Sequence, residues 1–232
     1  MSFLQAEQLR QQLAAHAARD MDVFLRTTFL ETPRPGAADG LAELGRHLLG
    51  AKEEAFDRAV AAVESARYAA LCLSTTAWIE TGAWTGDPEP VLAHARAAPI
   101  GETAPAILDR LRHAVKRRGR HLDRLDPASR HKLRIRAKRL RYAVEFFSRL
   151  STHPRREAEF LSILKRLQDD LGNLNDIAVA RDRLLAEGAL GEPDLAYAAG
   201  RAVGRREGQE GDLIASAGRH FRAFEKADPF WR

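Results

Sequence analysis

The chain has 232 residues, of which 45% are hydrophobic and 30% are charged, and its formal net charge is +5. Its length is sufficient for a buried core in one large domain or two small ones. The single cysteine, Cys72, excludes an internal disulfide framework, and its two leucine neighbours lead us to expect a buried thiol. No apolar run approaches the roughly 18 residues of a membrane span, and no signal-peptide pattern opens the chain, so we expect a cytoplasmic protein that does not act at membranes.

Nearly every long segment has the periodicity of an amphipathic α-helix. Prolines and glycines separate these segments, and Asp126 followed by Pro127 is typical of a helix N-cap and first helical position. No stretch alternates as a strand does, so the chain is predicted to be all-α. We predict helices over residues 2–31, 39–81 (two helices interrupted near 64–67), 105–125, 127–150, 154–187, 193–208 and 210–226.

The positive charge is concentrated in one region. Residues 105–141 contain fourteen Lys or Arg and three Asp, a net of +11, so the rest of the chain sums to −6. Such a concentration is typical of a surface that binds a negatively charged partner. The candidates are the protein's own carboxylates, nucleic acid, a membrane surface and a smaller polyanion.

The predicted helix over 127–150 has two distinct faces. At about 100° per residue, a polar sector and an apolar sector lie about 130° apart. We define the basic stripe as His131, Arg134, Lys138 and Arg141, which extend over roughly 15 Å of helix. Tyr142 and Glu145 fall in the same polar sector, Lys132, Arg136 and Arg139 lie on the flank, and the apolar face comprises Leu133, Ala137, Leu140, Val144 and Phe147.

The predicted helix over 154–187 repeats this design. Its apolar face carries Leu164, Leu167, Leu171, Leu174 and Ala178, and its polar face carries Lys165, Gln168, Asp169, Gly172, Asn175, Asp176 and Arg183. A glycine within a helix costs about 1 kcal/mol relative to alanine. We therefore expect Gly172 to allow the close approach of a neighbouring helix or of an anion.

Other basic side chains recur at a spacing of four residues. Arg112, Lys116 and Arg120 follow one predicted helix, and Arg201 and Arg205 lie near the C-terminus. If these surfaces converge, they form an elongated cationic groove between helices. Arginine forks and lysine charges in such a groove would hold a flexible polyanion.

The residues by themselves leave three other functions open. A nucleic-acid binder needs Lys and Arg for phosphates but also exposed aromatic or amide side chains for bases, and residues 105–141 contain no Phe, Tyr or Trp. A metal-dependent phosphohydrolase would use Asp169 with Asp176, or Asp20 with Asp22, although nearby arginines would compete with the metal. A helix that lies on a membrane surface agrees less well with the sequence, because its apolar face is needed for the core of the protein. No Gly-rich phosphate loop, nucleophile elbow or zinc-ligand spacing points to catalysis.

A weak internal repeat relates the two halves of the chain. Residues 17–29 are similar to residues 173–185 at an offset of 156, which pairs Asp20 with Asp176. At this offset the partner of the basic helix would precede residue 1. The sequence therefore predicts a duplicated helical bundle that lacks its first basic helix.

The stretch HKLRIRAKRLRYAVEFF, residues 131–147, resembles the signature helix of the CHAD family, the conserved-histidine α-helical domain. LKRLQDDLGNLNDIAVA, residues 164–180, is similar to the second signature of the family, and RDMDV, residues 19–23, to the matching segment of its first half. The resemblance implies a single domain over 1–232 made of two internally related antiparallel bundles of the four-helix type. The first bundle, 1–100, would be incomplete, and the second, 101–232, would carry the basic signature helix.

The resemblance also implies a function. CHAD domains similar to this chain bind inorganic polyphosphate in a basic groove, and some bacterial members localise to polyphosphate granules. It implies no catalytic residue, metal or cofactor, and it makes nucleic acid the weaker partner. An apolar face at the place of the first basic helix would favour a homo-oligomer. The residues expected to bind polyphosphate are His131, Arg134, Lys138, Arg139, Arg141, Lys165, Arg112, Lys116, Arg120, Arg19, Arg201 and Arg205, and those expected to orient them are Tyr142, Glu145, Gln168, Asp169, Asn175 and Asp176.

Overall fold

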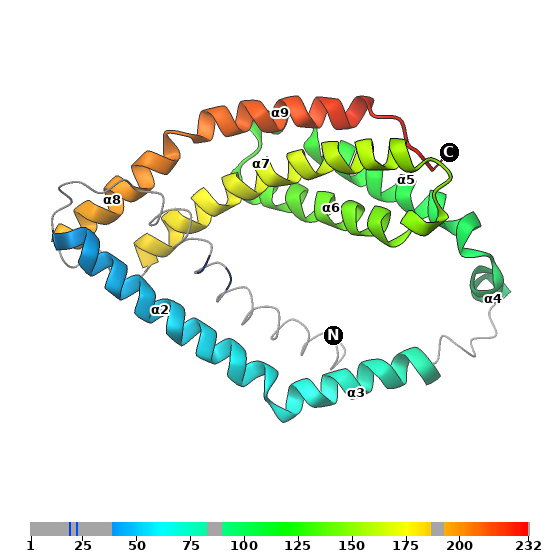
Figure 1. The fold of residues 1–232 in the computed structure, drawn as a ribbon, viewed down its shortest axis with the longest axis horizontal. Helices are drawn as coiled ribbons and strands as arrows, with labels where there is room; N and C mark the ends of the chain where they lie inside the picture. The colour runs from blue at the N-terminus through cyan, green and yellow to red at the C-terminus, as the bar shows by residue number, and fades with distance from the viewer. Residues whose placement is uncertain (1–18, 20–21, 23–38, 83–89, 187–192, 232) are drawn as a thin grey trace. The chain divides into compact units, whose positions relative to one another are not determined.

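The structure of the protein is a computed structural model that describes residues 19, 22, 39–82, 90–186 and 193–231 (Figure 1). These residues form α-helices and short 3₁₀-helices, with no β-strand among them, which confirms the predicted all-α fold. The predicted helix over 2–31 lies almost entirely outside the described residues, although Arg19 and Asp22 are helical. None of the described helices has an apolar stretch sufficient for a membrane span.

The chain divides into two compact units. The first comprises Met1–Arg96 and Val179–Val203, and the second comprises Ala97–Ala178 and Gly204–Arg232. The first unit is discontinuous in sequence, because residues 179–203 group with it. Two helices, α7 (Pro154–Ala186) and α8 (Pro193–Glu207), therefore contribute residues to both units.

In the first unit, α2 (Asp39–Val63) is separated from α3 (Ala66–Thr81) by a break at residues 64–65. The hydroxyl of Ser65 accepts a hydrogen bond from the Tyr68 N–H at 3.2 Å and donates one to the Ala62 carbonyl at 2.6 Å. This cap pairs an amide at the start of α3, and the predicted interruption near 64–67 is confirmed. Helical periodicity does not reveal α4 (Pro90–Ala97), because eight residues are too few to show it.

The expectation of a buried Cys72 is wrong, because this residue is exposed on α3. Its neighbour Leu73 is 73% exposed, and no residue of α3 is buried. Adjacent residues of a helix point about 100° apart. The leucines on either side of Cys72 therefore do not define the face on which the thiol lies.

The second unit is an antiparallel helical bundle (Figure 1). On neighbouring helices, His131 contacts Asn175 and Arg134 lies against Gly172, so their sequence numbers run in opposite directions. The helices of this unit are α5 (Ile100–Gly119), η3 (Leu122–Arg124), α6 (Pro127–Phe146), η4 (Ser148–Leu150), the first part of α7, the end of α8 and α9 (Glu210–Lys226).

Three helix bounds differ by several residues from those predicted, and one of them is the end of α6, which lies at Phe146 rather than at residue 150. α5 begins at Ile100 rather than at residue 105, and it ends at Gly119 rather than at residue 125. His121 has a φ of 57°, in the left-handed region, which a continuing helix does not allow. Pro105 lies inside α5, where it removes one helix hydrogen bond without ending the helix.

The core of the second unit is built from the apolar faces of its helices. All five apolar residues predicted on the helix of α6 and all four leucines predicted on α7 are buried in it, which confirms these positions, whereas Ala178, also predicted on the α7 face, is half-buried. Burying one Leu, Val or Phe side chain contributes about 1.5–3 kcal/mol. The other buried members of this core are Ala104, Leu108, Val115, Leu122, Phe160, Ala217, Phe221, Phe224 and Phe230.

The C-terminal segment closes this core. The ring of Phe160 lies with its centre 5.8 Å from Phe224, 5.9 Å from Phe230 and 5.2 Å from Trp231. The indole Nε1 of Trp231 donates a hydrogen bond to Asp109 Oδ1 at 3.1 Å. The segment after α9 thus joins α7 to α5.

α9 comes very close to α5 at Gly119. A Cβ atom at this position would overlap the ring of Phe221, and both residues are buried. Only glycine therefore fits beneath this ring.

We expect Gly119→Ala to destabilise the second unit by about 1–3 kcal/mol, because the ring or the backbone has to shift. Gly101→Ala on the same helix is the matched control, since nothing lies within 4 Å of its Cβ position, and it should leave the free energy of unfolding unchanged or slightly raised. Urea unfolding followed by circular dichroism measures both variants. Equal unfolding midpoints would contradict the packing of Phe221 on Gly119.

Candidate functional site

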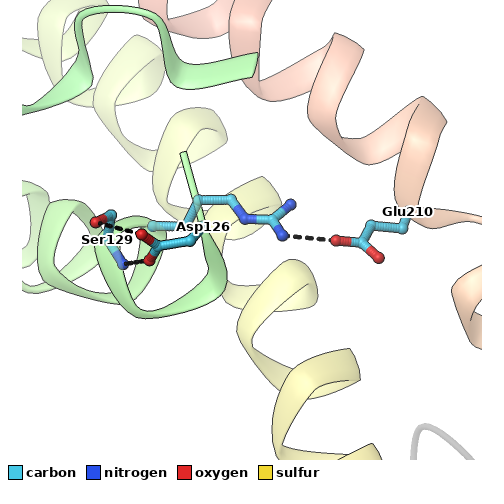
Figure 2. Close-up of polar contacts among 4 residues, drawn as sticks. Asp126, Ser129 and Glu210 are labelled. Atoms are coloured by element: carbon cyan, nitrogen blue, oxygen red, sulfur yellow. Dashed lines mark hydrogen bonds and ion pairs between the residues drawn. The ribbon is translucent and has the colours of Figure 1, made fainter. Parts of the chain in front are cut away.

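Asp126 fixes where α6 begins. Its carboxylate accepts hydrogen bonds from the Ser129 N–H at 2.6 Å and from the Ser129 hydroxyl at 3.2 Å (Figure 2), and Pro127 occupies the first turn. The predicted N-cap is confirmed. The bond from the Ser129 N–H lowers the pKa of Asp126, and Lys132 and Arg118 lower it further, so the cap is negatively charged at neutral pH.

The basic stripe follows the side of α6 that does not face the core. His131 is exposed, and Arg134, Lys138 and Arg141 are half-buried. The Nε atoms of Arg134 and Arg141 are buried, so part of each guanidinium packs on the protein. The contacts of each side chain show how the stripe is held.

His131 is held from α7. Its Nδ1 lies 2.5 Å from the amide oxygen Oδ1 of Asn175. A ring nitrogen that faces an amide oxygen acts as the donor. Asn175, one of the residues expected to orient the stripe, thus bonds directly to its first member.

Arg134 lies over the glycine of α7. Its Nε is 3.7 Å from the position that a Cβ of Gly172 would occupy. The same Nε is buried and makes no hydrogen bond with any described residue. Gly172 therefore allows a close approach, because the guanidinium of Arg134 on the neighbouring helix lies against it.

The other end of the stripe is organised within α6 itself. Arg141 Nη1 donates to Glu145 Oε1 at 3.2 Å, one helical turn away. Lys138 Nζ lies 5.5 Å from the centre of the Tyr142 ring, and Arg141 Cζ lies 5.0 Å from it, distances typical of cation–π contacts. Both residues of α6 that were expected to orient the cations contact them.

The remaining residues predicted on α7 share its polar face with Asn175 and Gly172. Lys165 and Asp169 are exposed. Gln168 and Asp176 are half-buried, and Gln168 Oε1 makes no hydrogen bond with any described residue. The contacts with the stripe that the structure shows for described residues of this face are those of Asn175 and Gly172.

Arg112 and Lys116 bind the end of α9. Arg112 Nη2 donates to the carbonyl oxygens of Glu225 at 3.3 Å and of Ala227 at 2.6 Å, and Lys116 Nζ donates to the Glu225 carbonyl at 2.7 Å. The last carbonyls of a helix have no partner within it, and cations stabilise that end. Burial lowers the pKa of Lys116, as does Arg112, while Glu225 opposes them. We therefore assign both cations to the scaffold.

The other predicted cations have no described contact with the stripe. Arg120 and Arg205 are exposed in the second unit, and Arg139 is exposed on the flank of α6. Arg19 and Arg201 are exposed and belong to the first unit. No hydrogen bond or ion pair between described residues joins any of these five arginines to the stripe.

The sequence analysis did not predict an ion pair that lies next to the stripe and contains a buried arginine. Arg130 is 7% exposed, and its Nη2 donates to Glu210 Oε1 at 2.6 Å, which joins the first turn of α6 to the start of α9 (Figure 2). The sequence does carry a signal for it, because Arg130 lies three residues before Leu133 and seven before Ala137, on the apolar face. A buried charge on that face requires a partner, which here is the half-buried Glu210.

Removing the carboxylate of Glu210 would leave Arg130 buried without its partner. We expect Glu210→Gln to lower the free energy of unfolding by about 2 kcal/mol. The control Asp228→Asn removes one partner of the exposed pair with Arg156 and should change that free energy by less than about 0.5 kcal/mol. Arg130→Met combined with Glu210→Leu should recover most of the loss.

Urea unfolding of the four proteins measures these differences. If Glu210→Gln and Asp228→Asn unfold at the same urea concentration, the buried pair does not constrain α6 and α9.

Comparison with known proteins shows what this arrangement is similar to. Residues 5–185 match the family model of the CHAD domain. The chain is also similar to the crystal structure of the CHAD domain from the plant Ricinus communis, with 30% sequence identity and a TM-score of 0.75 over 95% of this chain and 72% of that one. A comparison with curated proteins gave no match.

Proposed function

The chain belongs to the CHAD family, as its sequence motifs indicate, and from this premise we propose that it binds inorganic polyphosphate along the basic stripe of α6. The observation that carries the proposal is that the stripe is held in place from the protein side. Asn175 bonds His131, Gly172 makes room for Arg134, and Glu145 bonds Arg141. Side chains restrained in this way lose less conformational freedom when a ligand binds.

The shape of the stripe favours a chain of phosphates over a single anion. Its basic side chains are strung along roughly 15 Å of helix, so one phosphate cannot contact all of them. Two arginines supply forks that match phosphate oxygens, and a lysine and a histidine supply further donors. A linear polyanion would also reduce the repulsion between neighbouring cations of the helix.

RNA is the principal rival, because it offers the same phosphate charge. The stripe continues into Tyr142, which is 50% exposed, and Phe146, which is 76% exposed. Bases stack on free aromatic rings, but two cations already lie near the Tyr142 ring. We therefore retain polyphosphate as the ligand and include RNA as a competitor in the test.

The test compares two double variants that lose the same charge. Arg134→Ala with Lys138→Ala removes the centre of the stripe, and Lys132→Ala with Arg136→Ala removes two cations from the flank of the same helix. We expect the first to weaken polyphosphate binding by at least about tenfold, because charge-assisted contacts are lost, and the second by much less. Fluorescence anisotropy with labelled polyphosphate at several salt concentrations gives both affinities, which should fall steeply with salt.

Two outcomes would refute the proposal. Equal losses for the two double variants would show that only net charge matters. Stronger binding of RNA than of polyphosphate at the same salt concentration would make nucleic acid the ligand.

We propose that the chain binds polyphosphate without hydrolysing it. We also propose that it localises to polyphosphate granules in cells that contain them. A metal-dependent phosphohydrolase would instead release orthophosphate from polyphosphate with Mg²⁺ or Mn²⁺ and lose that activity in Asp169→Asn. A fluorescent fusion should follow the granules, and the Arg134→Ala/Lys138→Ala variant should not.

Gly172 offers a second, steric test of the stripe. Alanine there would place its Cβ 3.7 Å from Arg134 Nε, an ordinary contact, so Gly172→Ala should keep its affinity and gain up to about 1 kcal/mol of stability. A leucine would displace the guanidinium, and we expect it to weaken polyphosphate binding about threefold to tenfold. The same anisotropy assay measures both, and equal affinities would show that Arg134 does not depend on this approach.

A further inference from the structure

We propose that Asn175 is a positioning residue that couples polyphosphate binding to the uptake of a proton at His131. This inference rests on the proposed function, because it concerns the same stripe, and it adds a proton to the binding reaction. It begins with the contact of 2.5 Å between His131 Nδ1 and Asn175 Oδ1.

That contact determines which ring nitrogen of the neutral His131 carries the hydrogen. An amide oxygen can only accept, so Nδ1 must donate. A neutral imidazole has a single N–H, and Nε2, on the other side of the ring from Asn175, is left with a lone pair. His131 is exposed, so a ligand in solution can reach the ring.

A lone pair on Nε2 cannot bond to a phosphate oxygen, which is itself only an acceptor. Protonation turns Nε2 into a second donor and gives the ring a positive charge, and both changes favour phosphate. The proton and the polyphosphate therefore strengthen each other's binding by the same factor.

We expect the ligand to supply the negative charge that favours a protonated His131. The nearby carboxylates already have partners, since Asp126 caps α6, Glu210 binds Arg130, and Asp176 has an interaction of its own. The charged groups close to His131 in sequence are Asp126, Arg130, Lys132 and Arg134 on α6. Asp176 follows Asn175 on α7, Glu210 on α9 pairs with Arg130, and Arg118 on α5 acts on Asp126.

Isothermal titration calorimetry in buffers of different ionisation enthalpy measures the protons taken up on binding. The wild-type protein should take up as much as one proton per occupied stripe at slightly alkaline pH. Its affinity for polyphosphate should rise by up to about tenfold for each unit that the pH falls through the histidine range. His131→Gln is the reference, because it shows the protons that the ligand takes up by itself.

Two variants of Asn175 separate positioning from a structural role. Asn175→Ala lets the neutral ring carry its hydrogen on Nε2, so proton uptake should fall and the affinity should depend less on pH than in the wild-type protein. Asn175→Asp adds a carboxylate that favours the charged ring before the ligand arrives, so uptake should fall here too. An affinity that drops equally at every pH, with unchanged uptake, would overturn the proposal.

Nitrogen NMR of the histidine rings provides a readout that needs no ligand. In the free protein at alkaline pH, His131 should carry its hydrogen on Nδ1, and a hydrogen on Nε2 would overturn the proposal. Polyphosphate binding with no more proton uptake than in His131→Gln would also overturn it while leaving the proposed function intact. Failure of the wild-type protein to bind polyphosphate at any pH would instead refute the proposed function.

Discussion

The burial of Leu133, Ala137, Leu140 and Val144 fixes the rotation of α6, and the direction of every basic side chain on this helix depends on it. Each buried Leu or Val contributes about 1.5–3 kcal/mol. Repulsion between like charges one turn apart costs only about 0.2–0.5 kcal/mol per pair. The core therefore decides how the helix is turned, and the cations are left along the opposite side, where a polyanion would relieve their repulsion.

The contacts from α7 turn this charged surface into an organised site. Long basic side chains lose up to about 2 kcal/mol of conformational freedom when they are fixed. The short amide of Asn175 restrains His131 before any ligand is present, and the missing side chain of Gly172 leaves room for Arg134. In the function that we propose, folding of the second unit would thus meet part of the entropic cost of binding at the α6–α7 pair.

Much of the positive charge in residues 105–141 serves the scaffold instead of the stripe. Arg112 and Lys116 bind the carbonyl end of α9, and Arg130 binds Glu210 at its beginning. Cations of residues 105–141 that do not belong to the stripe therefore attach both ends of α9 to the rest of the bundle. The net charge of this region overstates the number of cations that a ligand can reach.

The sequence by itself determined what depends on neighbouring residues: the cap at Asp126, the break before α3, and the two faces of α6 and of α7. These follow from helix periodicity and from hydrogen bonds within a few residues. The tertiary structure alone decided the partners of Arg112 and Arg130 and the close approach at Gly119, and it showed that Cys72 is exposed. Such contacts join residues far apart in the chain, and they depend on how helices are rotated and packed against one another, which the spacing within one helix does not specify.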